Sequence, residues 1–191
     1  MSPQSKVLVT GGAGFIGSSL ARSLLSIGCQ VTVLDDLSTG RMENLTGLVG
    51  DSFRYQPGSV LDRDLVARLV DEADFVFHLA AAVGVQRVLQ NPDLTRDTNV
   101  QGTRNVLDTV TRKEGAMFLA STSEVYGTQC EVPCDEERVC RIDESSPRKT
   151  YAFSKQLSET MVLEAHRKGQ CRAVVARLFN TIGPRQVGHY G

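Results

Sequence analysis

The sequence predicts an α/β fold, a doubly wound parallel sheet with helices on both faces. Short runs of β-branched and apolar residues recur along the chain, and stretches with apolar residues at helical spacing separate them. A glycine-rich turn joins the first of these strands to the first helix. Because strand and helix then alternate to the end of the chain, the strands are expected to be parallel, in the order 3-2-1-4-5-6.

The elements follow from local patterns. The expected strands are residues 6–9, 30–34, 53–56, 74–79, 117–120 and 172–177. Helices are expected over 18–27, after Asp62 as N-cap, after Pro92, and over 151–168. Residues 37–51 form a predicted surface loop. Residues 128–149 form a second, whose length inside a compact domain is typical of a functional loop.

Composition excludes several classes of protein. The 191 residues suffice for one domain with a sizeable core, and the net charge of −1 indicates neither a nucleic-acid nor a membrane partner. The sequence contains no apolar run near the roughly 20 residues that span a bilayer, and the first residues lack the apolar core of a signal peptide. We therefore expect a soluble, cytoplasmic protein.

Three of the five cysteines, Cys130, Cys134 and Cys140, cluster in the second loop. Their spacing contains no C-x-x-C pair, and the three histidines lie far off in sequence. A structural zinc site is the alternative, but reduced thiols and no metal are the favoured interpretation.

The glycine turn indicates a phosphate site. Gly12, Gly14 and Gly17 fit the G-x-G-x-x-G pattern, and Gly11, Gly14 and Gly17 fit the related G-x-x-G-x-x-G spacing. Such glycines allow a tight turn, close approach of backbone to a pyrophosphate, and close packing of helix on strand. The N-terminus of the following helix then attracts the anion. The turn predicts a Rossmann-type dinucleotide-binding domain.

An acidic residue follows at the end of the second strand. Asp35 comes 18 residues after Gly17, near the distance at which a carboxylate meets the adenosine ribose. A carboxylate there accepts hydrogen bonds from both ribose hydroxyls and repels a 2′-phosphate. Unless Asp35 is simply a turn residue, it therefore favours NAD over NADP.

A second constellation lies further along the chain. Tyr151 and Lys155, four residues apart, share one face of the predicted last helix. A free phenol has a pKa of about 10, and a nearby ammonium group and the positive nicotinamide ring would both favour the phenolate. The fifth strand ends in a hydroxyl-rich turn, residues 121–124, at the carboxyl edge of the sheet. This arrangement is typical of a tuned general base.

Together these segments resemble the NAD-dependent nucleotide-sugar epimerase/dehydratase family, the extended short-chain dehydrogenase/reductases. The matching segments are residues 11–17, 35–40, 78–81, 99–103, 121–127, 151–155 and 177–180. They occur in the family's order over nearly the whole chain.

The resemblance implies a role for each matching residue. NAD would be bound by Gly11, Gly14, Phe15, Ile16, Gly17, Asp35, Asp36, Ser38, Thr39, Gly40, Ser59, Val60, Leu79, Ala80, Ala81, Asn99, Tyr151 and Lys155. Thr122 would bind the reacting sugar oxygen, Tyr151 would be the base, and Lys155 would bind the nicotinamide ribose. Glu124 would complete the catalytic group, and Asn180 would meet the substrate's diphosphate.

The resemblance leaves three functions open. A UDP-sugar 4-epimerase acting through a 4-keto intermediate is the first expectation, because the segment around Tyr151 is closest to the epimerases. A UDP-glucuronate decarboxylase or related dehydratase is the alternative. Ser123-Glu124 is similar to the decarboxylases and replaces the Asp-Glu pair of the 4,6-dehydratases, which argues against water elimination. The third candidate is a non-catalytic NAD-binding module.

The resemblance also suggests a domain division. Residues 1–177 would form the NAD-binding Rossmann domain, and residues 178–191 would begin a truncated substrate-binding domain. We therefore expect the chain to bind NAD without useful turnover of a nucleotide sugar. The full-length protein is expected to be a homodimer.

Overall fold

The computed structural model describes residues 2–82, 85–127, 133–137, 141–142 and 144–186, without the side chains of residues 85–87. Six parallel strands form one sheet in the order β3-β2-β1-β4-β5-β6, which confirms the predicted order. The strands are β1 (Lys6–Thr10), β2 (Gln30–Asp35), β3 (Phe53–Pro57), β4 (Phe75–His78), β5 (Ala116–Thr122) and β6 (Arg172–Leu178). The helices are α1 (Phe15–Ser26), α2 (Arg63–Glu72), α3 (Val85–Gln90), α4 (Pro92–Arg112) and α5 (Lys149–Arg167), with 3₁₀ helices η1 (Met42–Leu45) and η2 (Ser123–Tyr126).

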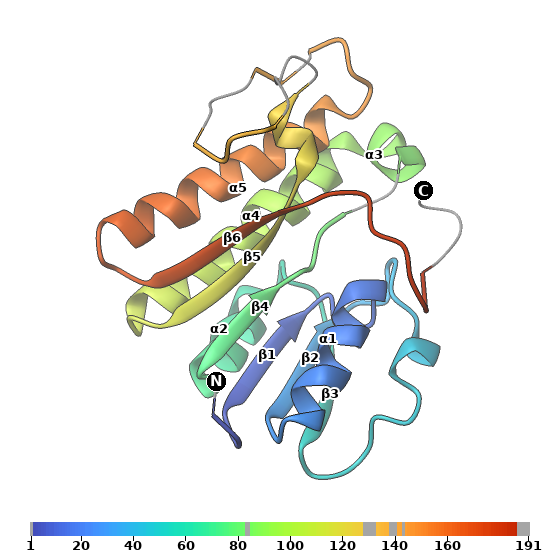
Figure 1. The fold of residues 1–191 in the computed structure, drawn as a ribbon, viewed down its shortest axis with the longest axis vertical. Helices are drawn as coiled ribbons and strands as arrows, with labels where there is room; N and C mark the ends of the chain where they lie inside the picture. The colour runs from blue at the N-terminus through green and yellow to red at the C-terminus, as the bar shows by residue number, and fades with distance from the viewer. Residues whose placement is uncertain (1, 83–84, 128–132, 138–140, 143, 187–191) are drawn as a thin grey trace.

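The two faces of the sheet are covered unequally. Helices α2, α4 and α5 pack on one face, and α1 packs on the other (Figure 1). The alternation along β1 explains the two cores. Leu8 faces α2, α4 and α5, whereas Val7 and Val9 face α1. Because both faces of the central strands are buried, these strands read as continuous apolar runs.

Two local features differ from the sequence-based expectation. Helix α1 begins at Phe15 rather than at residue 18, so its first turn follows directly from the glycine turn. The predicted loop 37–51 contains η1, and Asn44 within it is buried. The side-chain amide of Asn44 donates a hydrogen bond to the carbonyl of Ala13, 2.8 Å away, which fastens this loop to the glycine turn.

The expected N-cap of the second helix is confirmed. The carboxylate of Asp62 accepts a hydrogen bond from the backbone amide of Leu65 at 3.0 Å. In the described part of the chain, no helix combines the length and apolar character needed to cross a bilayer.

The segment after β6 returns to the first helix. It leaves the sheet at Leu178 and runs across the ends of the strands toward α1 (Figure 1). The guanidinium of Arg185 donates hydrogen bonds to the hydroxyls of Ser18 and Ser19, at 3.2 and 2.7 Å. Residues 178–182 are thereby held along the carboxyl edge of the sheet, where parallel α/β folds bind ligands.

Candidate active site

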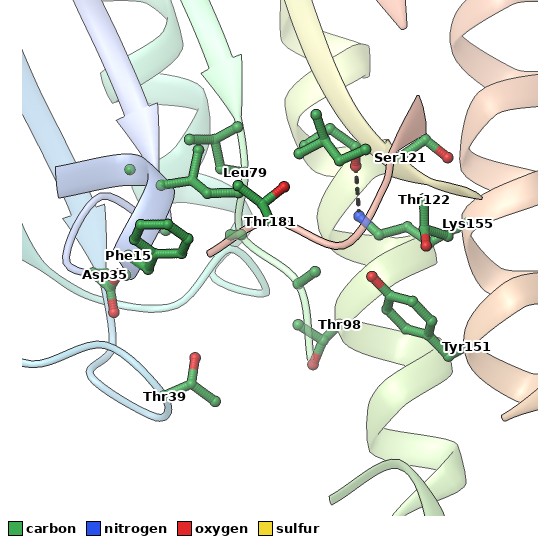
Figure 2. A pocket seen from close by; sticks show the side chains of 18 of the residues that line it. Phe15, Asp35, Thr39, Leu79, Thr98, Ser121, Thr122, Tyr151, Lys155 and Thr181 are labelled. Atoms are coloured by element: carbon green, nitrogen blue, oxygen red, sulfur yellow. Dashed lines mark hydrogen bonds between the residues drawn. The ribbon is translucent and has the colours of Figure 1, made fainter. Parts of the chain in front are cut away.

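A cavity of about 680 Å³ lies along the carboxyl ends of the strands. The glycine turn and the end of β2 form one end, and the ends of β5 and η2 with the first turns of α5 form the other (Figure 2). The predicted site residues that line it are Gly11, Gly14, Phe15, Ile16, Gly17, Asp35, Asp36, Ser38, Thr39, Val60, Leu79, Ala80, Ala81, Thr122, Glu124, Tyr151, Lys155 and Asn180. The fold thus brings residues that are far apart in sequence to one cavity.

The geometry of the glycine turn fits a pyrophosphate. Gly11 has φ +70°, and a Cβ there would lie 2.8 Å from the backbone nitrogen of Ala80, so no other residue fits without a shift. A Cβ at Gly17 would collide with the carbonyl oxygen of Gly11, which shows how closely α1 packs on the turn. At Gly14 a Cβ would meet only that same oxygen, at 3.2 Å, and the remaining side is open space. A pyrophosphate oxygen has room there, at the N-terminus of α1.

Asp35 is buried at the end of β2, and both carboxylate oxygens accept backbone hydrogen bonds. Ala13 donates to Oδ2 at 2.9 Å, and Leu37 donates to Oδ1 at 2.8 Å. Burial raises the pKa of this carboxyl, and the two backbone hydrogen bonds oppose the rise. Each oxygen keeps a second lone pair, so the carboxylate can still accept the two hydroxyls of a ribose.

Gly40 and Ser59 lie beside the cavity rather than on its wall. A Cβ at Gly40 would come within 2.9 Å of both the Ala13 side chain and the Asp35 carboxylate, so this glycine lets the loop close on the turn. The hydroxyl of Ser59 accepts a hydrogen bond from the amide of Leu61 at 3.3 Å, which caps the turn before α2. Neither is among the lining residues, and their predicted contact with NAD remains a prediction.

Asn99 also lies off the cavity wall, where it joins two elements. Its Oδ1 accepts a hydrogen bond from the amide of Ala82 at 2.9 Å, and its Nδ2 donates to the hydroxyl of Ser154 at 2.8 Å. That hydroxyl donates in turn to the carbonyl of Tyr151 at 2.7 Å. Asn99 therefore connects the loop after β4 to the first turn of α5.

Tyr151 and Lys155 both face the cavity from α5, as their spacing predicts (Figure 2). Burial, followed by the charge of Glu124, raises the pKa of Tyr151 to about 12, while Arg148 and a hydrogen bond from Thr122 oppose the rise. Burial lowers the pKa of Lys155 to about 8. The ammonium of Lys155 donates to the carbonyl of Ala120 at 2.8 Å.

The effect of Lys155 on the phenolate of Tyr151 stays a prediction. In this structure its ammonium donates to a carbonyl at the end of β5. The pKa of Tyr151 is raised because burial outweighs the nearby positive charge.

Glu124 and Arg148 form an ion pair on the cavity wall. An Nη2–Oε1 distance of 2.7 Å joins them, and both side chains are about one-third exposed, at 34% and 29%. The guanidinium carbon of Arg148 lies 5.5 Å from the ring centroid of Tyr151. Burial raises the pKa of Glu124, and Arg148 opposes the rise. Glu124, Arg148 and Tyr151 therefore lie together at this end of the cavity.

His78 lies behind the site, fully buried on β4. Thr10 Oγ1 is 2.8 Å from its Nδ1, and Thr103 Oγ1 is 3.1 Å from its Nε2. Thr10 Oγ1 accepts from the amide of Ala80, and Thr103 Oγ1 donates to the carbonyl of Asn99. The proton of neutral His78 is therefore on Nε2, and the ring connects β1, β4 and α4. Burial, together with Lys155, lowers its pKa to about 3.

The comparisons with known proteins agree with this geometry. A family model described as the NAD dependent epimerase/dehydratase family matches residues 7–190. The chain belongs to this family. The prediction made from the sequence is thereby confirmed, and NAD is the cofactor on which the family depends.

Curated relatives of this family member include decarboxylases. It is 37% identical over 182 residues to UDP-glucuronic acid decarboxylase 1 of Xenopus tropicalis, which covers 95% of the chain and 42% of the relative. It is 36% identical to UDP-N-acetyl-alpha-D-glucosaminuronate decarboxylase of Bacillus cytotoxicus, over 95% of the chain and 56% of the relative. The chain spans about half the length of the curated relatives it matches.

A solved structure of an epimerase is also similar. UDP-glucose 4-epimerase of Thermotoga maritima with UDP-glucose superposes with a TM-score of 0.85 at 30% identity. The match covers 97% of this chain and 60% of that one. Sequence relatives and this structural neighbour thus agree on the family and differ in the reaction they catalyse.

Several residues that line the cavity were not assigned a role from the sequence. Arg148 gave a weak signal, a cation three residues before Tyr151 and therefore one helical turn away. The others are Leu34, Asn44, Gly58, Thr98, Ala120, Ser121, Ser123, Leu178, Phe179, Thr181, Ile182 and Gln186. Four of these, Phe179, Thr181, Ile182 and Gln186, belong to the segment after β6, which sequence periodicity does not locate.

The described residues hold no group of three or more His, Cys, Asp or Glu side chains that could bind a metal ion. Cys134 is a partly buried free thiol. Cys130 and Cys140 lie outside the described residues, so the cysteine cluster remains a prediction.

Proposed function

We propose that the chain forms the NAD-binding part of an enzyme that oxidises a UDP-sugar at C4. The observation that carries the proposal is the single cavity that joins the glycine turn to Tyr151, Thr122 and Lys155. Residues 1–177 would form the cofactor domain in this scheme, and the part from residue 178 would begin the sugar-nucleotide site. When bound, NAD would accept hydride from C4 and bring a positive ring beside the phenol.

Tyr151 is the base in this proposal. Its phenol would remove the proton of the sugar's 4-hydroxyl, and Thr122, at the end of β5, would hydrogen-bond the same oxygen. A pKa of about 12 leaves little phenolate at neutral pH, a deficit of about 7 kcal/mol for the five units between 12 and 7. The site must therefore gain positive charge before Tyr151 becomes an effective base.

Decarboxylation of a UDP-uronate is the reaction that Glu124 favours. Oxidation at C4 makes the C6 carboxylate a β-keto acid, which loses CO₂ and leaves an enolate that needs a proton at C5. Glu124, which pairs with Arg148 in this structure, can donate that proton after taking one up from solvent, because burial raises the pKa of its carboxyl although Arg148 opposes the rise. Return of the hydride to C4 of the resulting 4-keto pentose would then give UDP-xylose. Two curated decarboxylases at 36–37% identity support this reaction.

A UDP-sugar 4-epimerase is the second candidate. Epimerisation needs only the base, the threonine and a sugar that rotates before C4 is reduced on its opposite face. Thr122 and Tyr151 meet that requirement without Glu124. The superposition on a UDP-glucose 4-epimerase at TM-score 0.85 favours this reaction, which was also the first expectation from the sequence.

Product analysis distinguishes the two reactions. The complete product of the gene is loaded with NAD and incubated separately with UDP-glucuronate and with UDP-glucose, and anomeric protons are followed by NMR. We expect UDP-xylose and CO₂ from the first and no UDP-galactose from the second. In Glu124→Gln, reduction of bound NAD by UDP-glucuronate should persist while UDP-xylose formation falls by about 10²-fold or more. UDP-galactose formation would favour the epimerase, and no NAD-dependent change in either sugar would overturn the proposal.

A further inference from the structure

The positive charge that contacts the ring of Tyr151 comes from Arg148 rather than from Lys155. The guanidinium carbon is 5.5 Å from the ring centroid, whereas the ammonium of Lys155 is bonded to the carbonyl of Ala120 at 2.8 Å. Arg148 is held over the ring at the start of α5, where its backbone amide donates to the hydroxyl of Ser146 at 3.2 Å. This placement positions a cation one helical turn before the proposed base.

Arg148 also determines the net charge beside that ring. Its Nη2 is 2.7 Å from Oε1 of Glu124, so the pair is neutral as a whole. Either charge alone would act on the phenol. Glu124 opposes loss of the proton from Tyr151, and Arg148 favours it. The two partners therefore have opposite effects on the same group.

The other groups around Tyr151 leave the ion pair of Glu124 and Arg148 as the charges that can change beside its ring. Lys155, on the same helix, is fully buried next to neutral His78 of β4. The strand β5 contributes the hydroxyl of Thr122, and the part of α4 that lines the cavity contributes an uncharged threonine. The pair lies on the cavity wall, and Nε of Arg148 is buried without a hydrogen-bond partner among the residues that the structure describes. A buried N–H without a partner is costly, which is unexpected of an arginine that only closes a surface ion pair.

We propose that Arg148 is a positioning residue that neutralises Glu124 and so allows Tyr151 to release its proton. The inference rests on the proposed role of Tyr151 as base. It holds for decarboxylation and epimerisation alike, since both begin with the same proton transfer. It also assigns the ion pair a function in the reaction beyond joining η2 to α5.

The proposal predicts shifts of opposite sign. Arg148→Gln leaves Glu124 unpaired and should raise the pKa of Tyr151 by about one unit or more. Glu124→Gln leaves the guanidinium of Arg148 without its carboxylate partner and should lower the pKa of Tyr151 by a similar amount. The double variant removes both charges and should return the pKa to within about half a unit of the parent value. One unit corresponds to a tenfold change in the phenolate fraction at neutral pH.

The titration can be measured directly. The 191-residue chain is labelled with ¹³C at the ζ carbon of its four tyrosines, loaded with NAD, and titrated by NMR, with Tyr151→Phe assigning the signal. NAD affinity is measured first for each variant, so that a weaker binding of the cofactor can be distinguished from a direct change in the pKa of Tyr151. No sugar is present, and the result is therefore independent of the reaction catalysed.

Two variants keep the test decisive. Arg148→Lys retains the charge and should keep the pKa of Tyr151 within about half a unit of the parent value. Arg177→Gln is the matched control, because Arg177 also pairs with a glutamate, Glu159, at 2.8 Å and stacks on a tyrosine, Tyr126, at 4.6 Å. Arg177→Gln should leave the pKa of Tyr151 unchanged. The proposal would be overturned if Arg148→Gln left the pKa of Tyr151 unchanged. It would also be overturned if the double variant did not return that pKa to the parent value.

Discussion

The two ends of the cavity are built on different physical principles. At the glycine turn, polar groups already have partners: both oxygens of Asp35 accept backbone amides, and Asn44 bonds the carbonyl of Ala13. The groups that would bind the cofactor are thus held in place by the backbone itself. Binding there would need little reorganisation, which is the condition for tight recognition.

At the other end the ionisable groups are displaced from their preferred state. Burial raises the pKa of Tyr151 to about 12 and lowers that of Lys155 to about 8. Ser121 Oγ and Arg148 Nε are buried and have no hydrogen-bond partner within the described part of the chain. Strongly perturbed groups of this kind gather where a protein performs chemistry. The contrast supports the proposal that one end binds the cofactor and the other transfers a proton.

The largest effect is expected from removing the proposed base. Tyr151→Phe deletes the phenol oxygen at the reacting end, so reduction of bound NAD by a UDP-sugar should slow by about 10²–10⁴-fold. NAD affinity should stay within a few-fold, because the glycine turn and Asp35 are untouched. Stopped-flow absorbance and calorimetry measure the two quantities. A rate within a few-fold of the parent would remove Tyr151 from the mechanism.

A second effect concerns His78, which connects β1, β4 and α4 behind the cavity. Its folded pKa of about 3 lies below its ordinary 6.5, so the unfolded chain binds the proton first as the pH falls. Stability is fully present above pH 6.5 and is lost progressively down to about pH 3. Over the two units from 6.5 to 4.5 this amounts to about 2.7 kcal/mol.

Urea unfolding at pH 7 and 4.5 tests this loss. His78→Gln should abolish this loss of unfolding free energy between pH 7 and pH 4.5, although the variant is less stable at both pH values. His166→Gln, at an exposed position near the end of α5, is the control and should retain the loss. An unchanged pH dependence in His78→Gln would mean that other groups titrate there.

A smaller effect is expected at the binding end. Asp35→Asn removes the charge but leaves one oxygen to accept a backbone amide. NAD should lose about 1.5–3 kcal/mol of binding, as for hydrogen bonds to a charged group, while NADP loses less. Calorimetry with NAD and with NADP measures how far the preference for NAD has decreased. Asp62→Asn, at the N-cap of α2, is the control. Equal affinity of the parent chain for NAD and NADP would contradict the role of Asp35.

Features that depend on local backbone geometry could be predicted from the sequence. The glycine spacing, the strand order and the shared face of Tyr151 and Lys155 follow from local geometry, and the structure has each of them. The direction of the Lys155 ammonium does not follow, because it depends on the carbonyl of Ala120, which another element supplies. The ion pair of Glu124 and Arg148 escaped prediction for the same reason, since it joins η2 to α5.

Asn99 has a mechanical consequence. Its side-chain amide bonds the loop after β4 at Ala82, at 2.9 Å, and the second turn of α5 at Ser154, at 2.8 Å. A displacement of α5 large enough to shift the phenol of Tyr151 must carry Ala82, and the cavity wall that precedes it, in the same direction. Through these bonds, Asn99 couples the position of the phenol to that of the cavity wall.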